Sequence, residues 1–306
     1  MRIGINAANL LALGAPLTKI YDHAARAEAD GFTSYWLGQM AVPDALTTIA
    51  ALGSHTTTIE LGTAVVPTWT RHPLMLAGQA LTVQEIVGNR LTLGIGLAHK
   101  ALVEPTLKVN YVKTSQHMEE YLDVLIPTLR DRTCDATGEI WSGADSLSGG
   151  VKAARAPSLL LAAMGPRMLA LAGRRADGSI LWLSGPRTIE GTIRPVLVAA
   201  AHAAGRPSPR IVAGLPICVT DDPARVRAQI DQSLDKYGKF DSYRHVLSLE
   251  SVSGPGDVAL VGDADAVREG LNALAKAGAT DFAATEFATN GDEAAATRAL
   301  LTAVAA

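Results

Sequence analysis

Residues 59–96 read IELGTAVVPTWTRHPLMLAGQALTVQEIVGNRLTLGIG. The pattern predicts a strand over 59–66, a helix over 73–87 that ends at Gly88, and a second strand over 90–95. Pro73 suits the first turn of this helix, where its missing N–H leaves no hydrogen bond unmade. A strand, a helix and a strand in this order favour parallel pairing with a right-handed crossover.

The same alternation continues on both sides of this unit. We predict further strands over 2–6, 33–37, 158–163, 179–183, 210–220 and 281–286, and helices over 17–29, 43–54, 115–130, 166–175, 188–204, 223–237, 264–277 and 293–304. Eight strands separated by helices predict an α/β protein with a (β/α)8 TIM-like barrel, which needs about 250 residues. A doubly wound sheet is the alternative. The surplus residues fall in three stretches that we expect to be loop excursions or insertions, 98–114, 131–157 and 238–257. Because no linker is visible, we expect one domain over 1–306.

The composition narrows the class of protein. The 306 residues carry 27 Lys and Arg against 30 Asp and Glu, and a net charge of −3 argues against a nucleic-acid-binding protein. No apolar run reaches the roughly 18 residues of a membrane span, and the chain enters a strand at Arg2 without a signal-peptide pattern. Two cysteines provide no disulfide framework. We therefore expect a cytoplasmic protein whose partner is a small molecule, with no nucleic acid and no membrane.

In a (β/α)8 barrel the active site lies at the carboxyl ends of the strands. The chain has few carboxylates there, no HExxH or paired CxxC spacing and no GxSxG turn, which argues against a metal site and a serine nucleophile. Such a site suits chemistry carried by a bound organic cofactor. Gly94-Ile95-Gly96 fails as a dinucleotide motif, because His99 stands where the third glycine belongs.

Met164-Gly165-Pro166-Arg167 opens a helix directly after a strand. Free backbone N–H groups at a helix start favour an anion, and Arg167 adds a positive charge. The stretch therefore predicts a phosphate site, with an ordinary tight turn as the alternative.

Several motifs together resemble the luciferase-like monooxygenase superfamily over residues 1 to about 287. They are GTAVVP (62–67), RHP (71–73), NRLTLGIG (89–96), GPRM (165–168), LAGRRADG (171–178) and VGD (261–263). The chain length and the strand end LGIGL (93–97) resemble the branch that uses coenzyme F-420, an 8-hydroxy-5-deazaflavin; FMN is the alternative cofactor. The resemblance implies a luciferase-like barrel and a homodimer.

The resemblance also implies cofactor-binding residues. A cis peptide between Ala64 and Val65, in a bulge of the third strand, would lie behind the deazaflavin ring, and Gly62 of the same strand is a further cofactor-binding candidate. The helix start after the fifth strand would hold the phosphate at Gly165 and Pro166, with Met164 and Arg167 beside it as further cofactor-binding candidates. The end of the fourth strand would line the ring and its tail through Leu97, His99 and Lys100.

Alcohol- and sugar-oxidising members carry an acidic residue and a histidine at the end of the second strand, where this chain has Gln39-Met40. Glutamine cannot act as a general base, although its amide can hydrogen-bond a cofactor. We therefore favour the reductive direction, in which hydride from C5 of the reduced cofactor reaches an activated C=C, C=N or C=O bond.

Six further residues are weighed individually. His99 is a candidate proton donor or a hydrogen-bonding residue of the cofactor loop, and Glu286 is a candidate acid or a surface carboxylate. Asn6, Asn9 and Trp69 are candidates for the substrate pocket, the asparagines being equally suited to turning the chain. His72 fits a structural role at a helix start.

These residues predict a coenzyme F-420-dependent oxidoreductase that moves a hydride to or from a small organic substrate. An FMN-dependent luciferase-like monooxygenase or flavin reductase, and a non-catalytic flavin-binding protein, remain alternatives. A barrel lyase or aldolase would need a lysine at a strand end, and none of the eight predicted strands contains one.

Overall fold

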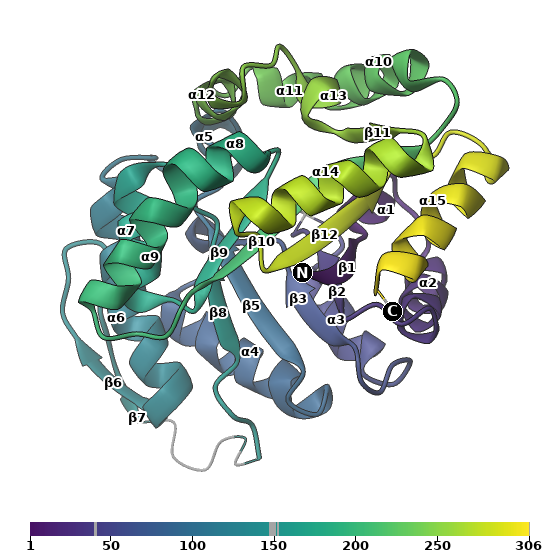
Figure 1. Cartoon of the computed structure of the whole chain (residues 1–306). Coiled ribbons are helices and arrows are strands. Elements are labelled where there is room, and N and C mark those ends of the chain that lie inside the picture. Colours follow the sequence, from purple (N-terminus) through teal and green to yellow (C-terminus); the bar gives the residue numbers. More distant parts are fainter. Residues whose placement is uncertain (40–41, 147–150, 152, 306) are drawn as a thin grey trace.

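A computed structural model describes residues 1–39, 42–146, 151 and 153–305. Eight parallel strands form a closed barrel, because β9 pairs with both β8 and β10 (Figure 1). In order around the barrel the strands are β1 (Arg2–Asn6), β2 (Ser34–Leu37), β3 (Glu60–Thr63), β5 (Leu91–Gly96), β8 (Ser158–Leu161), β9 (Gly178–Trp182), β10 (Arg210–Val219) and β12 (Asp281–Glu286). The predicted (β/α)8 barrel is confirmed.

Helices that connect the strands form the outer layer. They are α2 (Leu17–Ala29), α3 (Ala45–Leu52), α4 (Pro73–Ile86), α6 (Thr114–Asp131), α7 (Pro166–Arg175), α8 (Pro186–Thr188), which continues through a π-helical turn (Ile189–Ile193) into α9 (Arg194–Ala203), α14 (Ala264–Ala277) and α15 (Gly291–Ala305). Their apolar faces pack on outward strand residues such as Ile3, Leu61 and Phe282, which are fully buried.

Inward-facing side chains fill the barrel in layers. The middle layer is a separate apolar cluster of Trp36, Leu160, Ile180, Val212 and Ala283. Because side chains alternate along a strand, residues two positions further along point to the same interior at the carboxyl end. These residues are Gly38, Ala162, Trp182, Gly214 and Thr285, and Asn6 lies at the same end of β1; Trp182 is the large side chain among these six.

The amino-terminal layer is charged. Arg210 donates to Glu60 at 2.9 Å and to Asp281 at 2.8 Å, and Arg2 lies 2.6 Å from Glu60 and 3.2 Å from Asp281. A cavity of about 480 Å³ opens at this end, lined by these arginines and by Arg90. Two arginines against two carboxylates balance their charges, so this end of the barrel has the character of a structural ion-pair network.

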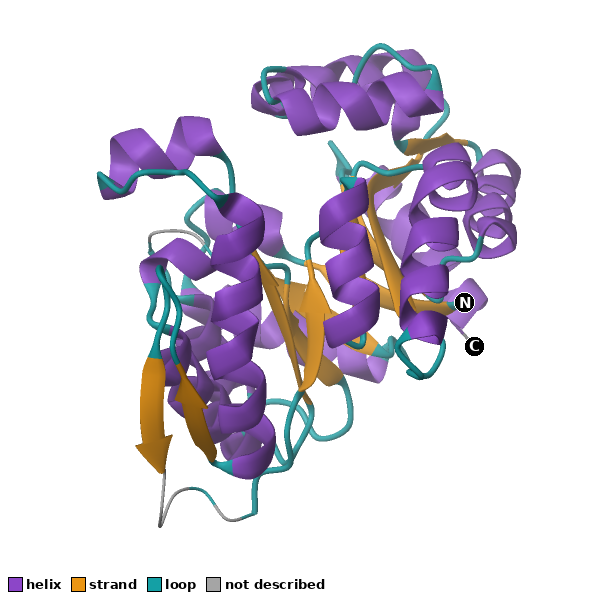
Figure 2. Ribbon diagram, turned by 90° about the vertical axis from the view of Figure 1, so that its left-hand side faces the viewer, coloured by secondary structure: helices purple, strands orange, loops and turns teal. Residues whose placement is uncertain are grey.

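Short elements extend the barrel at its ends. They are α1 (Ala8–Ala12), β4 (Val66–Pro67) with a 3₁₀ turn (Thr68–Thr70), α5 (Lys100–Leu107), the antiparallel hairpin β6 (Thr133–Ala136) and β7 (Gly143–Ser146), α10 (Pro223–Ser233), α11 (Asp235–Gly238), α12 (Asp241–Glu250), α13 (Pro255–Val258) and β11 (Leu260–Gly262). Figure 2 shows α5 and the α10–α13 group beyond the same end of the barrel. No helix within the described ranges is long and apolar enough to cross a membrane.

The three stretches expected to be irregular contain regular structure. Residues 98–114 include α5, 131–157 include the β6–β7 hairpin, and 238–257 include α12 and α13. The helix expected from residue 43 begins at Ala45, because Asp44 caps it by accepting from Thr47 N at 2.8 Å. The strand expected over 59–66 is split into β3 and β4 by a bulge.

Candidate active site

Small residues form a floor at the carboxyl end of the barrel, where β2, β3, β5 and β8 end. A Cβ atom at Gly96 would lie 2.9 Å from Val65 Cγ2 and 3.0 Å from Ala162 Cβ, and one at Gly38 would lie 3.4 Å from the Ala64 oxygen. The peptide bond between Ala64 and Val65 is cis, as the resemblance implies. Backbone and methyl groups thus form a flat apolar surface, which we call the floor (Gly38, Ala64, Val65, Gly96, Ala162).

A bulge between β3 and β5 places Val65 on the floor. Gly62 is opposite Thr92 and Val66 is opposite Ile95, so three residues of one strand face two of the other. The Thr63 hydroxyl holds the bulge: it donates to the Gly94 oxygen at 2.7 Å and accepts from Gly94 N at 2.8 Å.

Gly62 itself lies below the floor. A Cβ atom there would lie 2.2 Å from the Trp36 ring, so the absent side chain leaves room for this indole in the middle layer. The structure therefore separates Gly62 from Ala64 and Val65, with which the sequence grouped it.

Buried polar groups without partners gather at the same end. Within the described residues, five buried side-chain nitrogen or oxygen atoms have no hydrogen-bond partner, namely Trp69 Nε1, Arg71 Nη1, Trp182 Nε1, Ser184 Oγ and Thr285 Oγ1. Each belongs to the end of a barrel strand or to the segment that follows it. Because an unpaired buried polar atom costs about 1–3 kcal/mol, this concentration is typical of a site that binds a polar ligand.

The start of α7 is exposed and uncapped. Gly165 is the N-cap residue, no side chain caps the helix, and its first turn holds no acidic residue. A Cβ atom at Gly165 would meet nothing within 4 Å, and Pro166 and Arg167 are exposed as well. Met164, just before, packs partly on the core. This helix start has free N–H groups with room for an anion.

At the start of α8, which follows the next barrel strand, a glutamate side chain from the stretch 238–257 accepts a hydrogen bond from the helix backbone. Glu250, the last residue of α12, is 6% exposed, and its Oε1 accepts from Thr188 N at 2.6 Å. A Cβ atom at Gly185 would lie 2.7 Å from the Glu250 carboxyl carbon. The Glu250 side chain therefore occupies the start of α8, whereas no side chain of the described residues caps α7.

His99, in the stretch 98–114, contacts the stretch 238–257 at the carboxyl end of the barrel. Its ring stacks on Phe240 with centroids 4.3 Å apart and planes at 8°, and it lies 5.3 Å from the Tyr243 ring. Burial, and next the charge of Lys236, lower the pKa of His99, so the imidazole is neutral at pH 7. Leu97, just before, is half-buried, whereas Lys100 is exposed and lies 3.8 Å from Glu104.

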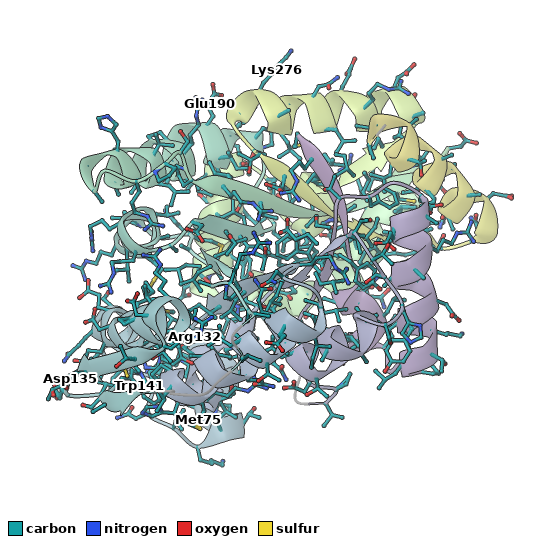
Figure 3. The ribbon with its side chains drawn as sticks, turned by 90° about the horizontal axis from the view of Figure 1, so that it is seen from below. Met75, Arg132, Asp135, Trp141, Glu190 and Lys276 are labelled. Atoms are coloured by element: carbon teal, nitrogen blue, oxygen red, sulfur yellow. The ribbon has the colours of Figure 1, made fainter. Side chains whose placement is uncertain are left out.

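Trp69 packs on a buried histidine that the sequence analysis missed. The Trp69 and His117 rings lie 3.7 Å apart, and His117 is fully buried. Trp141 Nε1 donates to His117 Nδ1 at 3.1 Å, which leaves Nε2 to donate to Thr68 Oγ1 at 2.8 Å. Figure 3 shows Trp141 in the same region as Asp135 of the β6–β7 hairpin and Arg132, on the opposite side of the view from Glu190 and Lys276. This chain of bonds fixes the segment that carries Trp69.

Because His117 is buried, we expect the folded protein to lose stability in mild acid. Burial lowers its pKa from an ordinary value of 6.5 to about 4, so the unfolded chain binds a proton first as the pH falls. Folding free energy is therefore lost between pH 6.5 and 4, by about 1–3 kcal/mol in total. Urea unfolding at pH 7, 5.5 and 4.5 measures this slope.

The variant His117→Gln provides the control for that slope, because glutamine does not titrate. The variant is expected to be less stable than the wild type at pH 7, but to lose less folding free energy between pH 6.5 and 4. The carboxylates of Glu28, Glu120 and Glu293, with pKa values of about 2, lose their contribution only below about pH 4.5. Equal slopes in the variant and the wild type would contradict the assignment to His117.

Three predicted site residues have partners elsewhere. Glu286 is on the outer face of β12, where Arg298 Nε donates to it at 2.8 Å. Burial raises the pKa of Glu286, but a hydrogen bond from His23 and the charge of Arg298 lower it overall, so it is ionised. Asn9 Nδ2 donates to the backbone carbonyl oxygen of Glu286 at 3.3 Å, and Gln39 Oε1 accepts from Ala45 N at 2.9 Å.

Two further observations complete the site. Asn6 lies at the inner end of β1 and is 8% exposed. Met40, next to Gln39, lies outside the described residues. Among the residues described, no three His, Cys, Asp or Glu side chains are grouped to hold a metal ion.

Comparisons with known proteins agree with this fold. The model of a family described as luciferase-like monooxygenase matches residues 1–281. The chain is 27% identical over 217 residues to 5,10-methylenetetrahydromethanopterin reductase of Methanolobus tindarius, which covers 70% of this chain and 65% of that protein. The match covers 49–66% of the length of this reductase and of two other curated relatives, so the chain spans only part of each.

Two solved structures share the fold over nearly the whole chain. The coenzyme F420-dependent tetrahydromethanopterin reductase of Methanopyrus kandleri superposes with a TM-score of 0.77 at 21% identity, over 98% of this chain and 97% of that one. A type II Baeyer–Villiger monooxygenase of Pseudomonas putida in complex with FMN superposes with a TM-score of 0.78 at 17% identity, over 100% and 96%.

Proposed function

The chain belongs to the luciferase-like monooxygenase family of oxidoreductases, and from this premise we propose that it is a coenzyme F420-dependent enzyme that transfers hydride to a small organic substrate. The observation that carries the proposal is the floor of small residues at the carboxyl end of the barrel. A flat ring fits against the backbone and the small side chains of the floor residues.

The bound cofactor would supply a hydride from C5 of its deazaflavin ring and so carry the electron chemistry. The chain's own residues would bind the cofactor and orient its ring. Val65 and Ala162 would contact one face of the ring, and the Thr63–Gly94 hydrogen bonds would keep that surface rigid. The unpartnered hydroxyl of Ser184 fits a polar group of the cofactor tail.

The cofactor phosphate would bind at the start of α7. Gly165 leaves open space there, and free N–H groups of the first turn attract negative charge. The start of α8 already has a carboxylate, that of Glu250, on Thr188 N. A phosphate is disfavoured beside this carboxylate. The cofactor phosphate would therefore bind at the start of α7, and the Glu250 side chain would stay at the start of α8.

The reductive direction is favoured by the absence of a candidate base at the second strand. The Gln39 side chain contacts the start of α3 and cannot accept a proton. Asp44 caps the same helix and pairs with Arg71. His99 is neutral and stacked on Phe240, an orientation compatible with hydrogen bonding to a ligand.

FMN is the second candidate, supported by the fold shared with an FMN complex. Equilibrium titration of the purified protein with coenzyme F420 and with FMN, followed by fluorescence, separates the two. We expect a micromolar or lower Kd for F420 and binding of FMN that is at least tenfold weaker. Tight FMN binding without F420 binding would reject the proposal.

A charge at Gly165 tests the phosphate site. Gly165→Asp places a carboxylate at the N-cap, where it stabilises α7 by about 0.5 kcal/mol but repels a phosphate. We expect the Kd for F420 to rise about tenfold or more, a change of about 1.4 kcal/mol. Gly165→Asn is the matched neutral cap and should keep the wild-type Kd. A deazaflavin that lacks the phosphate should bind all three proteins equally; a tenfold loss for it as well would reject the site.

The homodimer and the cytoplasmic location stay predictions. Light scattering coupled to size-exclusion chromatography would measure the first, with a mass of twice 31.9 kDa as the expected result.

A further inference from the structure

We propose that Thr285 and Asn6 form a hydrogen-bonding pair that holds the oxygen or nitrogen atom of a carbonyl or imine substrate. The inference rests on the proposed function, which it extends to a substrate class. It assigns a role to Thr285, the residue beside Glu286, and a partner to Asn6.

Thr285 faces the interior of the barrel at its carboxyl end. It is two residues beyond Ala283, a member of the inner cluster, and so shares its face of β12. Its partner in register on β10 is Pro216, which has no N–H to donate. The side chain is 4% exposed, and Oγ1 has no hydrogen-bond partner within the described residues.

Asn6 presents donors beside it. Ile5 is opposite Ala284 in the parallel ladder of β1 and β12, so Asn6 and Thr285 are the next residues along the two strands. Asn6 Oδ1 accepts from Ala8 N at 3.1 Å, which orients the amide so that Nδ2 points away from that bond. Nδ2 is the side-chain donor that remains beside the Oδ1 bond, and Asn6 is 8% exposed.

An amide N–H and a hydroxyl O–H are thus neighbours at the inner rim of β1 and β12. The floor lies on the next strands around the barrel mouth, β2, β3, β5 and β8, and consists mostly of apolar groups. The mouth therefore has an apolar half for a ring and a polar half for a group that accepts hydrogen bonds. A neutral acceptor fits this polar half, because both donors are uncharged.

The chemistry of hydride addition needs such a pair. The reduced cofactor would supply the hydride by breaking a C5–H bond, which oxidises its ring by two electrons. When this hydride bonds to the carbon of a C=O or C=N group, the π electron pair moves to oxygen or nitrogen. That atom gains negative charge and then takes a proton from water, which completes a two-electron reduction. Donors placed at this atom stabilise the charge as it forms, and each is worth about 100-fold in rate in comparable sites.

Stability separates this role from a structural one. A hydroxyl without a partner contributes nothing favourable to folding, so replacing it with an isosteric methyl group should leave the melting temperature unchanged or raise it. Thr63→Val is the matched control. Its hydroxyl has two partners on Gly94, so this variant should melt at a lower temperature.

The experiment compares wild type, Thr285→Val, Thr285→Ser and Asn6→Asp. The probe is 4-fluoroacetophenone, whose binding to the cofactor-free protein is followed by fluorine NMR and whose reduction is followed with reduced F420. The shape control is 1-ethyl-4-fluorobenzene, which lacks the carbonyl. Asn6→Asp keeps the acceptor for Ala8 N but loses the donor.

We expect Thr285→Val to keep the melting temperature and the F420 Kd, to weaken ketone binding about tenfold and to lower kcat/KM about 100-fold. Thr285→Ser should restore most of both, Asn6→Asp should weaken ketone binding, and binding of the control should not change. A lower melting temperature for Thr285→Val, or ketone binding equal to that of the wild type, would overturn the proposal. Failure of F420 binding would reject the proposed function alone, since the ketone-binding contrast is measured without cofactor.

Discussion

Replacing Gly94 with alanine is expected to cost the protein about 4 kcal/mol or more of folding free energy. A Cβ atom at this position would lie 2.0 Å from the Thr63 carbonyl oxygen, a backbone atom that cannot move without breaking the bulge. Both hydrogen bonds between Thr63 and Gly94 would be lost with it. Losses of this size are exceptional for one methyl group and are a large part of the 5–15 kcal/mol that stabilises a typical domain.

Urea unfolding followed by circular dichroism measures the loss, and the soluble yield on expression provides a second readout. Gly78→Ala is the control, because a Cβ atom at Gly78 on α4 would meet nothing within 4 Å. Alanine in this helix should stabilise the protein by about 0.5–1 kcal/mol. If both variants unfolded at the wild-type urea concentration, the role of the bulge in stability would be wrong.

Sequence patterns located elements that have clear boundaries. The predicted helices over 17–29, 166–175 and 264–277 agree with α2, α7 and α14 at both ends. Asp30 and Gly31 follow the first, Pro166 begins the second, and Gly278 ends the third in a left-handed conformation. These residues define helix ends locally, so no tertiary information is needed.

Elements of the excursions were missed because tertiary packing decides them. The helix α5 contains Pro105, a residue that indicates a helix end, and buries only Val103. The start of α12 is placed by stacking of Phe240 on His99, which is distant in sequence. No local pattern signals such contacts.

For the site, the sequence identified strand ends but not the face on which each side chain lies. Glu286 was selected at the end of the eighth barrel strand, yet it points outward to Arg298, and Thr285 points inward. Because side chains alternate along a strand, an uncertainty of one residue exchanges the two faces. His117 and Glu250 had no signal at all, since their partners are 49 and 62 residues away.

Replacing Ala162 with leucine is expected to weaken cofactor binding about 100-fold while the fold is retained. Ala162 is a half-buried residue of the floor, next to Gly96 and Val65, so a longer side chain extends over the surface proposed for the ring. A clash of this kind costs about 3 kcal/mol, which corresponds to a rise of about 100-fold in Kd. Thermal unfolding should change little, because the added atoms face the open end of the barrel.

This variant and Gly165→Asp affect different parts of one ligand, and their combination tests the whole binding mode. Ala162→Leu should weaken F420, FMN and the phosphate-free deazaflavin alike, whereas Gly165→Asp should weaken only the phosphate-bearing ligands. Ala162→Ser adds one small atom and should bind all three within about threefold of the wild type, a difference below about 0.7 kcal/mol. If Ala162→Leu bound the phosphate-free ligand as the wild type does, the ring would lie elsewhere, and the floor would be only part of the barrel's packing.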